Sequence, residues 1–141
     1  MQKALAVRVL EVTEYPPSGD GYSSCVFPIP SWEQIEAATR ALNHYRLPFF
    51  FIGLYDECHG EDCFSVFGGP NGYSISAEVK DLGWVQYCDP SHTGGPVDVW
   101  TSDQGFYPDE RYVTYDVELV LRLTRYYAEN GQLDPSVQWE Q

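Results

Sequence analysis

The sequence predicts an α+β domain in which an antiparallel sheet meander has two main helices packed against it. Three observations predict this class: one helical pattern comes early, another comes late, and short strand-like runs separated by turns lie between them. The predicted order is therefore strand, helix, strand meander, helix. Helices that lie outside a contiguous run of strands are typical of α+β domains. Strands joined by short turns pair antiparallel.

The chain opens with a run, residues 3–14, that we expect to form a strand. The run is rich in β-branched residues, and its alternate positions give one apolar face. Residues 16–21 follow as a loop because they are rich in proline and glycine. The next apolar run, residues 26–29, is short and flanked by proline, so we expect a connector or an edge strand.

The clearest start and stop signals belong to the first helix. Ser31 can cap its amino end, and Gln34, three residues later, can complete a capping box. Acidic residues come early and arginines come late, as the helix dipole favours. Apolar residues recur at helical spacing until Pro48 ends the pattern. We expect His44 near the end of this helix, as a surface or half-packed residue.

Between the two helical patterns, five runs are expected to form the strand meander. The first of these runs, residues 49–55, is continuously apolar, which suits a strand covered on both faces. The third run, residues 73–79, alternates apolar and polar residues, which predicts a strand with one wet face, that is, a face exposed to solvent. A glycine-rich turn, residues 68–72, separates the second run from the third. The five runs are residues 49–55, 63–67, 73–79, 84–87 and 97–101.

The second helix is expected at residues 115–129. Thr114 is its expected cap, and acidic residues occupy the first turn. Asn130 and Gly131 are a strong stop signal. The tail that follows contains Leu, Val and Trp at residues 133, 137 and 139, so we expect it to pack against the domain.

No linker divides the chain, so we expect one domain over residues 1–141. Domains cluster at about 100–150 residues, and a chain of this size can bury about two-thirds of its unfolded surface. An apolar content of 43% argues against disorder. No run matches a signal-peptide core or the ~20 apolar residues of a membrane span. We therefore expect a cytoplasmic protein.

Charge is concentrated in the middle of the chain. The chain has 8 Lys and Arg against 21 Asp and Glu, a net charge of −13. Residues 56–118 contain 13 of these acids and only Lys80 and Arg111 as bases, a net of −11. Such a surface repels phosphate backbones and anionic lipids, so we expect neither direct nucleic-acid nor membrane binding. The imbalance favours a partner of opposite charge, although a solvated face has the same composition.

Two expected loops combine acids with large aromatic residues. Aromatic anchors inside a charged rim are typical of protein interfaces. Trp100 is either such an anchor or a core residue. The expected partner-binding residues are Asp56, Glu57, Glu61, Asp62, Asp98, Trp100, Asp103, Asp109 and Glu110.

A metal site is the alternative hypothesis. Cys58, His59 and Cys63 are close in sequence, Cys88 and His92 could add a second half, and all are zinc ligand types. There is no paired Cys-x2-Cys, however, so a polar hairpin tip with free thiols is the simpler interpretation. We expect no cofactor.

Catalytic motifs are lacking. The sequence contains no Gly-x-Ser-x-Gly elbow. The glycine-rich residues 68–72 lack the Lys and Ser/Thr of a phosphate-binding loop and precede a predicted strand. We therefore expect a protein that is not an enzyme.

Four segments occur in a characteristic order. They are the opening helix at residues 30–38, the glycine turn at 68–73, Pro108 before the second helix, and the closing segment at 131–140. In this order they resemble the first-numbered immunity-protein family of bacterial polymorphic toxin systems. The resemblance spans about residues 30–141, and the cysteine-containing hairpin at 58–63 departs from the pattern.

This resemblance implies a cytoplasmic antidote that is not an enzyme. Such proteins bind a cognate toxin domain and block its active site or its substrate entry. Many toxins of these systems act on nucleic acids, as nucleases or deaminases, and such domains are often basic. An acidic inhibitor suits a basic partner because their fields are complementary.

Overall fold

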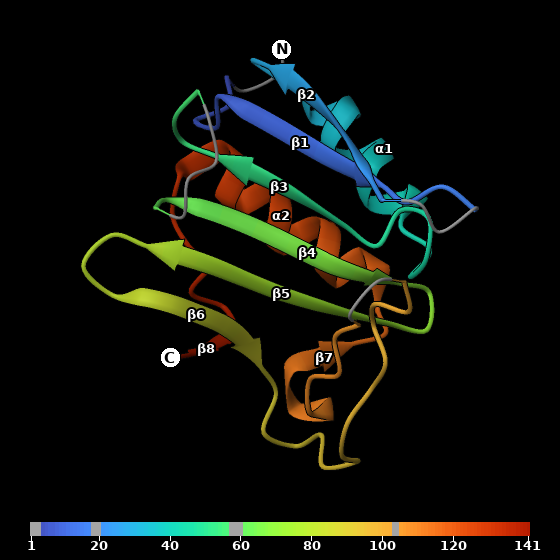
Figure 1. Ribbon diagram of the computed structural model, residues 1–141. Coiled ribbons are helices and arrows are strands. Elements are labelled where there is room, and N and C mark those ends of the chain that lie inside the picture. Colours follow the sequence, from blue (N-terminus) through green and yellow to red (C-terminus); the bar gives the residue numbers. More distant parts are fainter. Residues whose placement is uncertain (1–3, 18–20, 57–60, 103–104) are drawn as a thin grey trace.

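The fold is built on one antiparallel sheet of eight strands, with two α-helices packed against one of its faces (Figure 1). The computed structural model describes residues 4–17, 21–56, 61–102 and 105–141. It confirms the predicted α+β class. The elements in chain order are β1 Val9–Glu14, β2 Ser23–Pro28, α1 Trp32–Ala41, β3 Phe49–Gly53, β4 Cys63–Gly69, β5 Gly72–Val79, β6 Gly83–Cys88, the 3-10 turn η1 Glu110–Tyr112, β7 Val113–Thr114, α2 Val117–Asn130 and β8 Gln138–Glu140.

The strand order across the sheet is β2-β1-β3-β4-β5-β6-β8, and the short β7 pairs with β5. Strands β3 to β6 form the predicted meander. The hairpin of β1 and β2 is added at one edge, because β1 rather than β2 pairs with β3. Strand β2 is therefore an edge strand, which is one of the two alternatives predicted for residues 26–29, and it begins three residues earlier, at Ser23.

The main core lies between the sheet and both helices, which are behind the sheet in the view of Figure 1. Phe50, Phe64 and Ile75 point to this side, where Leu123 and Tyr127 of α2 meet them. Because side chains alternate along a strand, the intervening residues point to the opposite face. Strand β3 is buried on the helix side, and on the opposite face Phe49 is covered while Phe51 is half-buried, so the prediction of a strand covered on both faces holds only in part.

Helix α1 begins as predicted and ends earlier. The amide of Gln34 donates to the Ser31 hydroxyl at 3.1 Å, and the amide of Ser31 donates to the Gln34 side chain at 2.9 Å. The helix ends at Ala41, because the Asn43 side chain accepts the amides of residues 45 and 47 and so replaces helical bonds with a turn.

Helix α2 begins two residues later than predicted. Its cap is Asp116, whose carboxylate accepts the Glu118 amide at 3.0 Å. Thr114, the expected cap, lies in β7 and pairs with Tyr73 of β5. Gly131, with a φ of 67°, ends the helix as predicted.

The structure corrects two predicted strands. The strand predicted at residues 97–101 is wrong: that segment has one isolated bridge, between Trp100 and Phe106, and folds back on its own loop instead of joining the sheet. The strand predicted at residues 3–14 begins at Val9, because the amides of Ala6 and Val7 donate to the Ala128 carbonyl of α2.

The tail packs as expected and also adds a strand that was not predicted. Trp139 lies in β8 and pairs with Tyr87 of β6. Its indole nitrogen donates to the Asp134 carbonyl at 2.8 Å. Neither described α-helix has the length and the apolar character that crossing a membrane requires.

The two faces of the sheet should respond differently to truncation of an aromatic residue. Phe64 is fully buried and stacks on Tyr127 with ring centroids 4.8 Å apart, so we expect Phe64→Ala to lower the free energy of unfolding by about 3–5 kcal/mol. Trp84, on the opposite face, is 45% exposed. We expect Trp84→Ala, the matched control, to cost less than half as much. Urea unfolding measures both variants, and equal losses would contradict the assignment of the two faces.

Candidate functional site

The sheet face opposite the helices carries an ordered set of side chains. The register places Phe51, Ser65 and Ser76 side by side across β3, β4 and β5, and Glu11 of β1 extends this row. Directly paired residues on one face of a sheet have neighbouring side chains. We call this surface the open face.

A second row runs beside the first across the same strands. Gly53, Cys63, Glu78 and Trp84 are paired in succession from β3 to β6. Gly53 contributes no side chain, and Cys63 contributes only a small thiol. The two large side chains of this row, those of Glu78 and Trp84, therefore lie together at its β5–β6 end.

The small side chains at the centre of the open face leave a hollow of about 270 Å³. Its floor is formed by Cys63, Ser65 and Ser76, and larger aromatic side chains surround that floor. Among the described residues, its lining includes two carboxylates and no basic side chain. The residues that line it are Glu11, Phe51, Cys63, Ser65, Phe67, Ser76, Ala77, Glu78 and Trp84.

The two serines of the floor are hydrogen-bonded to each other. Their hydroxyl oxygens are 2.8 Å apart, and the Ser65 hydroxyl is also 3.3 Å from the Ser76 carbonyl. Activation of a serine nucleophile requires an adjacent base, commonly a histidine. Here the two hydroxyls pair with each other and form a small polar floor between the aromatic side chains.

An aromatic cluster closes one end of the hollow. Tyr15, Phe49 and Trp100 are its buried members, and Phe67 and Phe106 pack against them. Trp100 is 8% exposed and its ring lies 5.1 Å from that of Phe49. Of the two interpretations offered for Trp100, the structure therefore places it in a core, where it holds the long loop between β6 and η1 against the open face.

Trp84 is the exposed aromatic residue of the hollow and is absent from the predicted partner-binding set. It stands at the start of β6, opposite Glu78 of β5. The sequence contains one signal for it. Residues 73–79 predict a strand with a wet face, and the register of the next hairpin puts Trp84 on that face.

His44 ties the same loop to the glycine turn between β4 and β5. It is buried, with 8% exposed, and lies after α1 in a left-handed conformation with φ of 71°. Its Nδ1 is 3.1 Å from the Val99 carbonyl, and its Nε2 accepts the Asn71 amide at 3.0 Å. Because a carbonyl only accepts, the ring proton is on Nδ1. The expectation of a surface or half-packed histidine on the helix is thus wrong.

The predicted acidic residues at 56–62 do not all serve one surface. Asp56 is exposed and pairs with Arg8 at 2.8 Å. Glu61 is exposed. Asp62 stabilises the turn, because it accepts the Lys80 amide at 3.2 Å and the Tyr55 hydroxyl at 3.1 Å. Glu57 lies outside the described residues.

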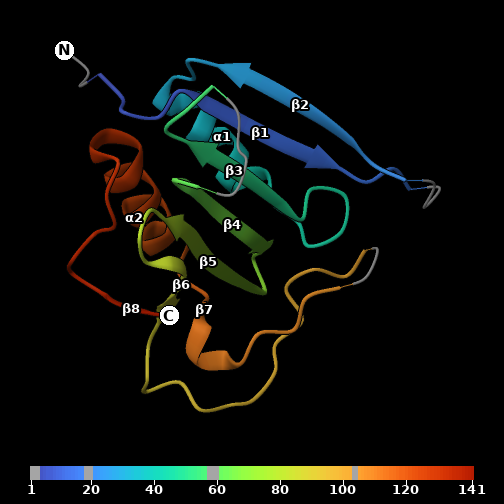
Figure 2. The ribbon, with the colours of Figure 1, turned by 60° about the vertical axis from the view of Figure 1, so that its left-hand side comes forward.

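The predicted residues at 98–110 lie at the other end of the sheet. Asp98 is exposed. Asp109 caps η1 by accepting the Arg111 amide at 3.2 Å, and Glu110 is half-buried. Asp103 lies outside the described residues. Strand β4, with seven residues, spans about 20 Å between the two groups, so they flank the open face rather than form one cluster (Figures 1 and 2).

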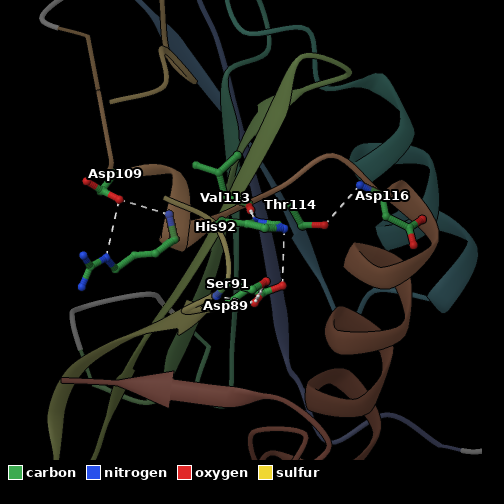
Figure 3. Close-up of polar contacts among 8 residues, drawn as sticks. Asp89, Ser91, His92, Asp109, Val113, Thr114 and Asp116 are labelled. Atoms are coloured by element: carbon green, nitrogen blue, oxygen red, sulfur yellow. Dashed lines mark hydrogen bonds and ion pairs between the residues drawn. The ribbon is translucent and has the colours of Figure 1, made fainter. Parts of the chain in front are cut away.

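The turn after β6 brings together Asp89, Ser91 and His92 (Figure 3). The Ser91 hydroxyl donates to the Asp89 carboxylate at 2.6 Å. The Nδ1 atom of His92 is 3.1 Å from the Val113 carbonyl, and its Nε2 atom is 3.4 Å from the Asp89 carboxylate. A catalytic relay needs the serine hydroxyl on the histidine. Here the serine bonds the aspartate, so the group fastens this turn to β7.

The residues of the metal hypothesis do not form one site in the part of the chain that is described. Cys63 begins β4, whereas Cys88 ends β6. The register puts them four residues apart along the strands and two strands apart across the sheet, which is about 13 Å by 10 Å. Among the described residues no trio of His, Cys, Asp and Glu could hold a metal ion. Cys58 and His59 lie outside those residues.

Cys88 belongs to a cluster that fastens β8 to the sheet. Its thiol donates to the Glu140 carboxylate at 3.2 Å, and the Tyr112 hydroxyl donates to the same group at 2.9 Å. Burial, and then Glu140, raise the pKa of Cys88 to about 11. The thiol is therefore protonated at neutral pH. The two donated hydrogen bonds lower the pKa of Glu140.

No protein-family model matches this sequence, and no curated protein sequence matches it. The interpretation of the open face therefore rests on the residues of this chain. They form a hollow whose floor is small and polar and whose sides carry aromatic residues and two glutamates.

Loss of the His44 side chain should release the loop that forms one wall of the open face. In His44→Ala the Asn71 amide and the Val99 carbonyl lose their partners, which should cost about 1–3 kcal/mol of stability. We expect faster hydrogen exchange at the Asn71 and Thr101 amides. His92→Ala is the matched control and should leave both amides protected. Unchanged exchange in His44→Ala would contradict the assigned tether.

The cysteines should differ in reactivity because a thiolate, not a thiol, is the nucleophile. Cys25 is exposed, whereas burial and Glu140 hold the pKa of Cys88 at about 11. We expect iodoacetamide at neutral pH to label Cys25 first and to leave Cys88 largely unmodified, as read by peptide mapping. Glu140→Gln removes one cause of the raised pKa and should increase labelling of Cys88. Equal rates at the two cysteines in the unaltered protein would contradict this cluster.

Proposed function

We propose that this chain is an immunity protein that binds a cognate bacterial toxin domain through the open face and occludes its active site. One observation carries the proposal: the hollow of the open face combines exposed aromatic surface with two carboxylates and no described basic residue. The order of motifs that resembles an immunity-protein family supports it. In this role the protein acts in the cytoplasm and is an inhibitor rather than an enzyme.

The shape of the open face suits the binding of a protein surface. Interfaces depend on a few well-packed anchors, and tryptophan is the residue most enriched among them. Trp84 is 45% exposed at one side of the hollow, and Phe51 and Phe67 lie at the other. The small floor between them leaves room for a side chain of the partner.

The charge of the molecule is arranged to direct a basic partner to this face. Six arginines occur in the chain, and three of them, Arg40, Arg122 and Arg125, lie on the helices that cover the opposite face. Glu11 and Glu78 line the hollow itself, and the exposed Asp98 belongs to the loop whose Trp100 packs in the aromatic cluster. Complementary fields accelerate the encounter of two proteins and select against partners of the wrong charge. A nuclease or deaminase domain with a basic substrate cleft would fit this field.

Charge reversal on and beside the open face should slow association with the cognate toxin domain that we propose. We expect four substitutions by lysine to lower the association rate constant by about tenfold or more at low salt. Stopped-flow mixing at several salt concentrations measures this effect. The four residues are Glu11 and Glu78, which line the hollow, and the exposed Glu61 and Asp98, which flank the open face at its two ends.

A matched control changes the net charge equally on the helical side. It replaces four acids of α1 and α2 with lysine, and urea unfolding confirms that both variants fold. We expect this control to slow association far less, because the charges lie behind the sheet. Equal effects of the two variants would show that net charge, and not the open face, governs the encounter. The four control residues are Glu33, Glu36, Glu118 and Glu129.

A further inference from the structure

Among the described residues, strand β2 pairs only with β1, so its outer hydrogen-bonding edge faces no described strand. The Ile29 amide donates to the Arg8 carbonyl at 2.9 Å, which fixes the alternation of the bonds between β1 and β2. Every second residue of an antiparallel strand then directs its amide and carbonyl away from its neighbour. On β2 these residues are Ser24, Val26 and Pro28. Proline suits such an outward position because it has no amide hydrogen to donate.

Of the usual protections against strand pairing, the described edge of β2 has the outward Pro28 and no charged side chain. Natural edge strands are commonly shielded by charged residues, lysine above all. Residues 21–32 contain no charged residue, in a chain with a net charge of −13. Three large apolar side chains are exposed here: Tyr22 at 65%, Val26 at 55% and Ile29 at 66%.

An apolar groove lies beside the same strand on the helix side. Its volume is about 400 Å³, and it runs between β2 and α1. Phe27 and Cys25 line it from the strand, and Ala37 and Ala38 line it from the helix. A strand added at this edge would therefore gain apolar contacts as well as main-chain hydrogen bonds.

We propose that β2 pairs antiparallel with β2 of a second copy of this chain, forming a two-fold symmetric dimer with one continuous sheet. The charge distribution favours a second copy as the occupant. Residues 1–55 carry a net charge of only −1, and beside this edge Asp56 is paired with Arg8, whose carbonyl accepts the Ile29 amide. The other described acids of residues 56–118 belong to β5, η1, α2 and the loops around β4 to β7. Edge pairing thus keeps the two acidic regions apart. This inference goes beyond the proposed function, because it leaves both open faces free.

One symmetric register uses the outward groups of β2 best. Ser24 pairs with Val26 of the second copy, and Val26 with Ser24, which gives two hydrogen bonds for each pair. Cys25 then faces Cys25 of the second copy as the central pair without hydrogen bonds. The side chains of such a pair are close, since their Cα atoms are about 4.5 Å apart.

The experiment measures the oligomeric state by sedimentation equilibrium over about a hundredfold range of concentration, with the full chain. We expect a concentration-dependent dimer. Val26→Pro removes only an outward amide, and Val26→Lys places a charge on the edge, so both should be monomeric and folded. Val26→Thr keeps the amide and the branched side chain, and it should remain dimeric.

Cross-linking tests the register. A short bismaleimide should join two copies through Cys25, and Cys25→Ser should abolish the product. A monomeric wild-type chain, or dimers that persist in both Val26→Pro and Val26→Lys, would overturn the proposal. A cross-link that forms equally in Cys25→Ser would also overturn this register.

Discussion

The alternation of side chains along β3, β4 and β5 is the constraint on which both faces of the molecule depend. Phe50, Phe64 and Ile75 fill the main core, and their sequence neighbours form the opposite face. A shift of one residue in register would exchange the two sets. Burial of the large apolar side chains therefore fixes the position of the small floor residues as well. The stability of the core and the shape of the hollow have one common origin.

The long segment between β6 and α2 is positioned by a small number of strong contacts. Trp100 packs in the aromatic cluster, and His44 satisfies groups on both the loop and the glycine turn. Without such tethers, ordering a loop of this length would cost substantial conformational entropy. The described part of this loop thus becomes a wall of the open face.

Features that depend on local sequence could be predicted. The capping box of α1, the glycine end of α2 and the alternation of β5 each arise from residues within a few positions of one another. The predicted wet face of β5 is wrong, because its Ser74 and Ser76 are buried. Features that depend on contacts between residues far apart in the sequence could not be predicted. Residues 97–101 have a strand-like composition, but the sheet offers them no partner, and His44 is buried only because a distant loop covers it.

The candidate site shows the same division. Composition located the excess acid in residues 56–118, but the order of strands separates the two predicted acidic groups by the length of β4. Trp84, Glu11 and Phe51 come from three different strands, so only the strand register brings them to one hollow.

Carboxyl footprinting of the complex with the toxin partner that we propose tests the central claim most directly. Glycine ethyl ester with a carbodiimide labels accessible carboxylates, and mass spectrometry compares the free and bound protein. Our account predicts that the toxin protects Glu11, Glu78 and Asp98, while Glu33 and Glu118 on the helices stay as reactive as in the free protein. Protection of the helical carboxylates with full labelling of the open face would contradict it.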